Sequence, residues 1–531
     1  MMKRLIICFD GTWNNPEQEE NGVTTPTNVY RLKNCISATA NSSEVTQKVF
    51  YHPGVGGEEI GLIDEFLGGA LGIGINRHIS SAYHWLGLNY REGDEVFLFG
   101  FSRGAFSARS LAGFLGKGLV NLQGISAEES WHRVETAFNS GYKDKMPQNQ
   151  WAKNHWSFFH DKGAIPITFL GVWDTVGALG IPDDLEIINL FDRKDSWQFH
   201  DTKLADHIEH ARHAMAMDEK RSSFTVTRWS NVKEHNDAVE LWFPGVHSDV
   251  GGGYQDSDLS NGALKWMIKQ SKSFGLEFRQ DIDQLIIDNP IGVLHNSFKG
   301  VFSKLRSRPR NIPALIKANS GQFHDSAFIR QRISPIEHEP YYPTQMLAVN
   351  EATTLQIYAK CRWNKTSVYL EQGHEYVFSA KGQWQDGVES CDWLGTEYNN
   401  QRTAGDLFRA TSSFLGKFES LIKRFNKNVS TDFFASKRVE DKPWFGLIGA
   451  IANDSGQAHK NLNVNHQTEQ QQVVKHDGSA IPHQYIQLAE HQENAPLLIN
   501  HAGYLYCFAN DAWSFYENNK GYIELTITRV K

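Results

Sequence analysis

To about residue 345, the chain alternates short apolar runs with stretches whose spacing suits helices. The runs richest in β-branched and aromatic residues are 5–9, 49–51, 95–99, 167–172 and 240–243. Each has the length of a strand, and each is followed by a loop rich in glycine or in aspartate and asparagine. This alternation is typical of a mostly parallel sheet with helices on both faces. It predicts an α/β domain over residues 1–345.

After about residue 345 the pattern changes to strands separated by turns, at 368–370, 376–380, 505–509 and 522–528. In the last of these, Ile523, Leu525 and Ile527 point to one side and polar residues to the other. A period of two residues is the pattern of a half-buried strand. We therefore predict a second domain over residues 346–531, built as a β-sandwich with a helical insert near 405–428.

The composition is that of a globular protein with more than one core. The chain has 531 residues, 40% hydrophobic and 21% charged, and no apolar run reaches the roughly 20 residues of a membrane span. A net charge of −8 argues against nucleic acid as a partner, because phosphate binding needs clustered cations. Five cysteines without metal-type spacing favour a reducing compartment. The N-terminal apolar stretch is too short for a signal peptide, so we expect synthesis in the cytoplasm.

Candidate chemistry begins with Ser102, which stands in a G-x-S-x-G motif between Gly100 and Gly104. The motif joins an apolar strand to a helical stretch, the context of a tight turn that lifts a nucleophilic hydroxyl above the sheet edge. The backbone N–H of Arg103 would then face the oxyanion of an acyl transfer. An ordinary glycine-rich turn is the alternative interpretation.

A serine nucleophile needs a base and an orienting carboxylate, which follow it in the order acid, then histidine. Asp174 comes just after the strand at 167–172, and His247 lies in a loop after the strand at 240–243. We predict that His247 accepts the Ser102 proton and that Asp174 orients His247. Asp174 also suits a helix N-cap or a turn, and His247 a structural role. Asp249 is a rival for the acid role, although its place in a glycine-rich loop favours a bracing role.

Asp10 and Gly11 follow the first predicted strand and begin a D-G-T sequence. A backbone N–H of this loop is a candidate second oxyanion donor, with Asp10 as a brace for the loop. A simple turn at the end of the strand explains the same residues.

Six motifs occur in order within residues 3–345: F-D-G-T-W-N at 9–14, T-N-V at 27–29, G-V-G at 54–56, G-F-S-R-G-A at 100–105, V-W-D-T-V-G at 172–177 and F-P-G-V-H-S-D-V-G-G at 243–252. Together they resemble the α/β-hydrolase family that includes type VI secretion lipase effectors. The resemblance implies an α/β-hydrolase fold and a phospholipase or related esterase, with Ser102, Asp174 and His247 at the catalytic positions. It implies no cofactor for catalysis.

The C-terminal region resembles the galactophilic calcium lectins of bacteria, which are small β-sandwiches. The similar segments are 368–370, 376–384, 446–451 and 509–522. The resemblance implies calcium as a candidate ligand of Asp511, Asn518 and Asn519, with the carbonyl groups of Asp386 and Phe515 completing the set. Oxygen atoms of these kinds suit a hard cation. Asparagine and aspartate beside a hairpin also form Asx turns, which need no metal.

A phospholipase must contact lipid, and two segments have the spacing of basic amphipathic helices. The first runs from Phe298 to Arg310, and the second covers residues 414–427. Such helices can lie in a membrane interface, although an ordinary helix packed on its own core has the same spacing.

The leading hypothesis is a serine carboxylester hydrolase that acts on membrane glycerophospholipids and is delivered into target cells by a type VI system. Its partners would be a lipid surface, the secretion machinery and an immunity protein. A second hypothesis is a protein that binds a glycan or another partner, with a hydrolase-like scaffold. The joint presence of Ser102, Asp174 and His247 favours the enzyme. A third is an esterase for a soluble ester.

Overall fold

The computed structural model describes most of both predicted regions. It leaves undescribed residues 1, 12–18, 21, 39–44, 55–69, 154, 161–162, 178–202, 300–306, 336–337, 339, 388, 397–436, 454–482 and 514. The predicted helical insert near 405–428 and the basic segment at 414–427 therefore lie outside the described residues. Among the helices that are described, none combines the length and apolar character that a membrane span requires.

Six strands form one sheet in the N-terminal region, in the order β4-β1-β5-β6-β7-β8. Their bounds are β1 Lys3–Phe9, β4 Thr46–His52, β5 Glu95–Phe101, β6 Ile167–Trp173, β7 Ile208–Ala216 and β8 Ala238–Phe243. All neighbouring strands of this sheet run parallel. Strands β1, β5 and β6 are mostly apolar because helices cover them on both faces. The five predicted strands are confirmed, and β7 is an addition.

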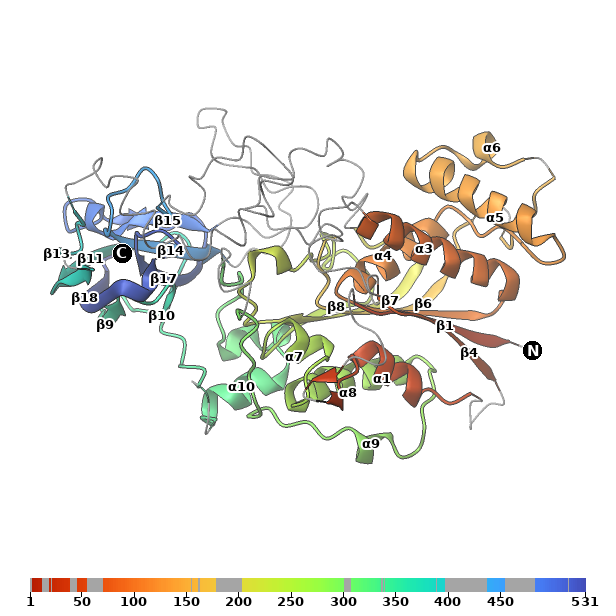
Figure 1. The fold of residues 1–531 in the computed structure, drawn as a ribbon, viewed down its shortest axis with the longest axis horizontal. Coiled ribbons are helices and arrows are strands. Elements are labelled where there is room, and N and C mark those ends of the chain that lie inside the picture. Colours follow the sequence, from red (N-terminus) through yellow and green to blue (C-terminus); the bar gives the residue numbers. More distant parts are fainter. Residues whose placement is uncertain are drawn as a thin grey trace.

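Helices pack on both faces of this sheet, which confirms the α/β prediction (Figure 1). One face carries α3 Ala70–Asn89, α4 Arg103–Leu115, α5 Ala127–Thr136, the π-helix η1 Ala137–Lys143 and α6 Gln148–Trp151; the other carries α1 Asn28–Cys35, α7 His247–Gly251 and α8 Asp258–Ser273, with α9 Ile282–Leu285 and α10 Asp325–Arg332 on the same side. Strand β1 shows the division, because Leu5 and Ile7 join one apolar core while Ile6 and Cys8 join the other.

The C-terminal region forms two antiparallel sheets that share one apolar core. The first contains β10 Asn364–Leu370, β17 Gly503–Ala509, β14 Leu447–Asn453 and β15 Gln484–Gln487. The second contains β13 Glu389–Cys391, β12 Trp384–Asp386, β18 Asn519–Arg529, β11 Glu375–Lys381 and β16 Leu497–Leu498, with β9 Ala352–Tyr358 paired to β18. Shorter elements are β2 Glu19–Glu20, β3 Val23–Thr24, and the 3-10 helices η4 Ser222–Phe224, η6 Lys317–Gln322, η8 Leu488–Glu490 and η9 Tyr516–Asn518. The four strands predicted here are confirmed.

The sheet β10-β17-β14-β15 is buried on both of its faces. In β17, Leu505 and Cys507 point into the core shared with the other C-terminal sheet. Tyr506 and Phe508 point the other way, into a core that also contains Trp242 of β8. Alternating residues of one strand therefore serve two cores, and the second core joins the C-terminal region to the α/β sheet.

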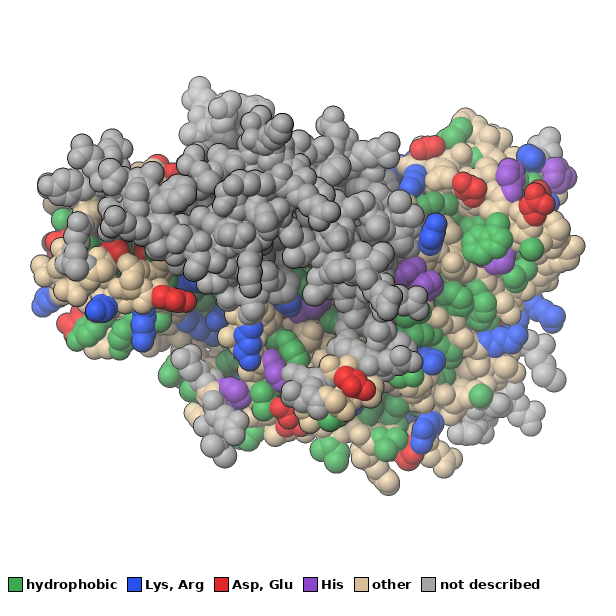
Figure 2. Space-filling model, in the orientation of Figure 1, with side chains coloured by type: hydrophobic (Ala, Val, Ile, Leu, Met, Phe, Trp, Pro, Cys, Tyr) green, Lys and Arg blue, Asp and Glu red, His purple; other side chains and the backbone are tan. Residues whose placement is uncertain are grey.

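Charges of both signs are interspersed on the described part of one face of the molecule. In the face shown in Figure 2, acidic and basic side chains lie near one another over the helices on the right and over the C-terminal sheets on the left. On the described part of this face, the charges do not form the clustered cationic surface on which phosphate-backbone binding depends.

Candidate active site

Ser102 lies in the sharp turn between β5 and α4. Its backbone has φ 58° and ψ −123°, a conformation that non-glycine residues rarely adopt outside strained functional turns. The neighbouring glycines permit the close packing: a Cβ on Gly104 would lie 2.2 Å from the Phe9 carbonyl oxygen, and one on Gly100 would lie 2.4 Å from the Gly104 carbonyl oxygen. The Ser102 side chain makes no capping hydrogen bond to α4.

Asp174 follows the end of β6 in a fully buried turn with φ 38°. Its backbone N–H donates to the Ala214 carbonyl of β7 over 2.7 Å. No helix begins at this residue within the described residues 174–177. Of the two alternative interpretations of Asp174, the helix N-cap is therefore wrong, whereas the turn residue agrees with the structure.

His247 is the first residue of α7, just after β8, and its Nδ1 lies 2.5 Å from Asp174 Oδ2. Because a carboxylate only accepts hydrogen bonds, Nδ1 carries the proton and Nε2 of the neutral ring is an acceptor. The ring packs against Phe101, which precedes Ser102, with centroids 4.5 Å apart, and against Phe224 at 4.9 Å. Burial lowers the pKa of His247, although Asp174 opposes the shift. The neutral imidazole is thus favoured near neutral pH.

Arg310 is a second partner of Asp174 that the sequence did not identify. Its Nη1 donates to Oδ1 over 2.5 Å and its Nη2 to Oδ2 over 2.8 Å, while the Ala216 N–H donates to Oδ1 over 2.9 Å. Burial would raise the pKa of Asp174, but the charge of Arg310 and the hydrogen bonds from His247 and Arg310 outweigh it and lower that pKa. The carboxylate is therefore held ionised in a buried position.

The described ends of the first amphipathic segment differ from the predicted helix. Phe298 and residues 307–311 lie outside any helix, and Pro309 disfavours helical backbone at the residue before it. Residues 300–306 are outside the described part of the chain. Arg310, which the sequence grouped with the membrane-facing cations of this segment, is instead buried against Asp174.

The loop after β1 lies against the Ser102 turn. Asp10 accepts hydrogen bonds from Thr27 Oγ1 at 2.8 Å and from the Tyr51 hydroxyl at 2.7 Å, so it braces the loop. The Gly11 N–H donates to Asp10 Oδ1 over 2.8 Å, which occupies this candidate oxyanion donor. Burial raises the pKa of Asp10 to about 6, although these hydrogen bonds oppose the shift. Thr12, the third residue of this loop, lies outside the described residues.

Asp249, the rival acid, has partners other than His247. Its Oδ2 accepts from the Val246 N–H over 2.9 Å, and its Oδ1 lies 2.6 Å from His295 Nδ1. The Tyr254 ring stacks on His295 with centroids 3.9 Å apart. Asp249 thus holds the start of α7 in place, as a loop brace would.

Two further buried groups near Asp174 and His247 were missed from the sequence. Glu219 Oε2 accepts from the His247 N–H over 3.2 Å. His213 Nε2 accepts from the Thr175 N–H over 3.1 Å. Both side chains act on backbone amides, and a contact of this kind leaves no motif by which a single sequence could reveal it.

The five candidate calcium ligands lie together near the start of β18. Asn519 Nδ2 donates to Asp511 Oδ2 over 2.9 Å, and Asn518 Nδ2 donates to Asp386 Oδ1 over 3.0 Å. The Phe515 carbonyl accepts from the Asn518 N–H over 3.3 Å. The buried Asn519 Oδ1 has no hydrogen-bond partner, and this oxygen beside the Asp511 carboxylate fits a hard cation. Within the described residues, no three His, Cys, Asp or Glu side chains form a metal-binding group.

Comparison with known proteins identifies the catalytic part of the chain. The family model of the catalytic domain of Tle1-like phospholipase effectors of type VI secretion matches residues 3–270. The uncharacterized protein YEL023C of Saccharomyces cerevisiae is 30% identical over 239 residues, which span 42% of this chain and 32% of the yeast protein. The chain thus matches about a third of that relative, which is itself eukaryotic.

Two solved structures show weaker likeness. An uncharacterized protein from Pseudomonas aeruginosa is 18% identical, with a TM-score of 0.34 over 55% of this chain and 49% of that one. The Tle1 effector, solved bound to the VgrG spike of the type VI secretion system, is 21% identical, with a TM-score of 0.30 over 48% of this chain and 52% of that one. Both scores are low, so the assignment rests on the family model. Because that model matches half of its length, the chain belongs to the family of Tle1-like type VI secretion phospholipase effectors.

Proposed function

We propose that the protein is a serine carboxylester hydrolase of the α/β-hydrolase type that acts on membrane glycerophospholipids. The observation that carries the proposal is the 2.5 Å contact between His247 Nδ1 and Asp174 Oδ2, with the His247 ring against the residue before Ser102. The phospholipase family to which the chain belongs supports the same conclusion. The three residues come from the carboxyl ends of β5, β6 and β8, where open α/β sheets place their chemistry.

The reaction follows from this arrangement. His247 Nε2 removes the proton from Ser102 Oγ as the oxygen attacks the ester carbonyl carbon. The Arg103 N–H and the N-terminus of α4 stabilise the resulting oxyanion. His247 then protonates the departing alkoxide, which leaves as lysolipid, and the acyl group stays on Ser102. Water, deprotonated by His247, attacks this acyl-enzyme, and collapse of the second intermediate releases the fatty acid and returns the proton to Ser102.

The remaining parts of the proposal concern the organisation and partners of the chain. We place the boundary between the catalytic domain and a lectin-like β-sandwich near residue 345. The family supports delivery by a type VI system and a partner in the secretion machinery. An immunity protein is a further part of the proposal. Calcium at Asp511 and Asn519, and a glycan bound to the C-terminal domain, are parts of the same proposal.

Mixed phospholipid vesicles test the activity. The wild-type protein, with and without calcium, should release fatty acid and lysolipid, which mass spectrometry identifies. The substitution Ser102→Ala should abolish release because it removes the attacking oxygen. The exposed Ser273→Ala, on α8, is the matched control and should release both products normally.

Each failure has a distinct meaning. Release that persists in Ser102→Ala would contradict the serine mechanism. Turnover of a soluble short-chain ester without turnover of vesicles would contradict the lipid substrate and favour an esterase for a soluble ester. Binding to immobilised glycans without any ester turnover would favour the binding protein on a hydrolase scaffold.

A further inference from the structure

We infer that Arg310 is a positioning residue for the Asp174–His247 pair, and that the C-terminal sheets hold it in place through residues 307–315. The inference rests on the proposed function, because it concerns the same catalytic pair. Arg310 lies beyond residue 270, where the match to the catalytic-domain family ends. The C-terminal region thereby helps to orient the catalytic pair.

The Arg310 guanidinium is fixed by four hydrogen bonds. Two reach the Asp174 carboxylate, at 2.5 and 2.8 Å. The other two reach backbone carbonyl oxygens, from Nη1 to Ala216 over 2.8 Å and from Nη2 to Phe224 over 2.6 Å. A planar guanidinium matches a carboxylate at both oxygens, so this pairing sets the direction of the carboxylate as well as its charge. Since Asp174 Oδ2 also contacts His247 Nδ1, the orientation of the imidazole depends on the same pair of hydrogen bonds from Arg310 to Asp174.

The backbone on both sides of Arg310 is held by side chains from the C-terminal region. Trp363 Nε1 donates to Ser307 Oγ over 2.9 Å. The buried His483 presents Nε2 to the Pro309 carbonyl oxygen at 2.8 Å and to Asn311 Oδ1 at 3.0 Å. Both partners are acceptors, so Nε2 carries the proton. These contacts hold the residues directly before and after Arg310.

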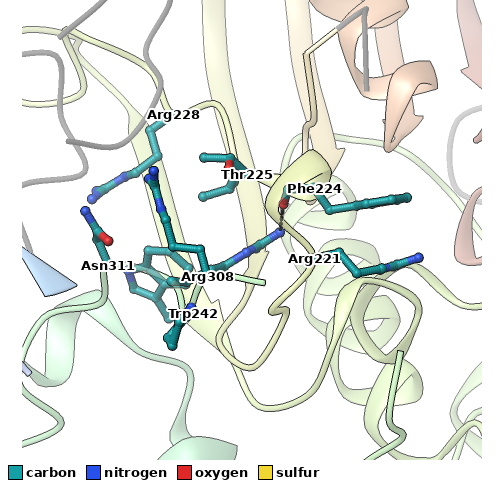
Figure 3. Close-up of a pocket in the computed structure, with 10 residues that line it drawn as sticks. Arg221, Phe224, Thr225, Arg228, Trp242, Arg308 and Asn311 are labelled. Atoms are coloured by element: carbon teal, nitrogen blue, oxygen red, sulfur yellow. Dashed lines mark hydrogen bonds between the residues drawn. The ribbon is translucent and has the colours of Figure 1, made fainter. Parts of the chain in front are cut away.

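Apolar packing strengthens the same connection. Ile312 and Leu315 lie in the core that contains Tyr504 and Phe508 of β17, and the Leu315 N–H donates to the Tyr504 hydroxyl over 2.8 Å. Figure 3 shows the nearby pocket, with Asn311 on one side and Phe224, which touches the His247 ring, on the other. Residues 307–315 thus connect β17 to the candidate catalytic acid.

Loss of Arg310 has a specific electrostatic consequence. The charged groups that act on His247 are Asp174, Glu219 and Arg221, with Arg310 acting through Asp174. Without Arg310, the negative charge of the buried Asp174 carboxylate acts on the His247 ring without compensation from the guanidinium, so the protonated imidazole is stabilised. The pKa of His247 should therefore rise. A merely structural loss would lower activity without moving this pKa.

The test compares the single variants Arg310→Met, Arg310→Lys and His483→Phe with the double variant Arg310→Met/His483→Phe. Each is made in the whole chain and measured with a soluble short-chain ester. We expect Arg310→Met to lower kcat by about 10²-fold, the effect of a small misplacement of a catalytic group, and to move the acid limb of the kcat/KM profile to higher pH. Arg310→Lys keeps the charge, so its acid limb should stay near that of the wild type. The exposed Arg332→Met, on α10, should leave activity and profile unchanged.

If His483 acts through Arg310, then His483→Phe should lower kcat, and the double variant should be no worse than Arg310→Met alone. Additive losses would overturn this link.

Selective ¹⁵N labelling of histidine in Ser102→Ala gives the His247 pKa without turnover. An unchanged His247 pKa after Arg310→Met would overturn the positioning role. If Ser102→Ala retains esterase activity, the proposed function fails, whereas normal loss in Ser102→Ala with no effect of Arg310→Met overturns this inference alone. Far-ultraviolet circular dichroism verifies the fold of each variant.

Discussion

At the scale of single residues, the site depends on histidines whose tautomers are fixed by their neighbours. His247 faces a carboxylate with Nδ1, which leaves Nε2 as the basic atom. His213 has the same tautomer for a different reason: its Nε2 accepts from the Thr175 N–H, and its Nδ1 lies 3.1 Å from Glu240 Oε1. Thr175 follows the candidate catalytic acid, so His213 holds the backbone of the turn that presents Asp174.

His213→Ala should destabilise the protein by about 1–3 kcal/mol at pH 7.5, because the buried Thr175 N–H and Glu240 lose a partner. Burial lowers the pKa of His213 in the folded state. The wild type therefore keeps the contribution of His213 above the unfolded pKa of about 6.5 and loses it as the pH falls below that value. The difference in unfolding free energy between wild type and variant should shrink toward pH 5.5.

Urea unfolding at pH 7.5 and 5.5 measures this difference. His132→Ala, which removes a histidine whose side chain is 53% exposed, is the control and should cost little at either pH. A difference that grows on acidification would contradict the neutral His213.

At the scale of elements, the sequence predicted five of the six strands of the α/β sheet but missed β7. That strand carries Arg212, whose partner Asp237 lies just before β8, and His213, whose partner Glu240 lies on β8. Its polar residues are buried only because a neighbouring strand neutralises them, and that pairing is not local in sequence. The loops after β5, β6 and β8 were predictable as sites, since parallel strands end at one edge of the sheet. The role of Arg310 was not predictable, because Arg310 stands in a basic segment and nothing in that segment indicates that one of its arginines is buried.

Gly104→Ala tests the turn between β5 and α4. The added Cβ would lie 2.2 Å from the backbone oxygen of Phe9, which cannot move aside without shifting β1. We expect a loss of about 3 kcal/mol or more in unfolding free energy, and loss of ester turnover. Gly321→Ala is the matched control, because its Cβ meets nothing within 4 Å. Equal stability of the two variants in thermal unfolding would contradict the tight packing of this turn.

At the scale of the whole molecule, the α/β sheet and the C-terminal sheets share a core and a buried hydrogen-bond cluster. The Tyr504 hydroxyl accepts from the Leu315 N–H at 2.8 Å and lies 2.6 Å from Thr344 Oγ1. These bonds connect β17 to the chain that follows the α/β sheet. The shared core and these hydrogen bonds therefore hold the two regions together more firmly than a flexible linker alone would.

Tyr504→Phe should lower the unfolding free energy by about 1–2 kcal/mol, because the buried Leu315 N–H loses its acceptor. Adding Thr344→Val should cost less than the sum of the two single changes, since both remove one shared bond. Tyr522→Phe, at a side chain that is 41% exposed, should be nearly neutral. Strict additivity in urea unfolding would count against the shared bond.

The central claim is that His247 activates Ser102. A fluorophosphonate phosphonylates an activated serine oxygen with loss of fluoride, so it reports the nucleophile without any choice of lipid. Tryptic mass spectrometry should find the adduct on the peptide that contains Ser102 in the wild type, and labelling should fall at least about 10²-fold in His247→Gln. An adduct at a different residue, or equal labelling of the wild type and His247→Gln, would contradict the account.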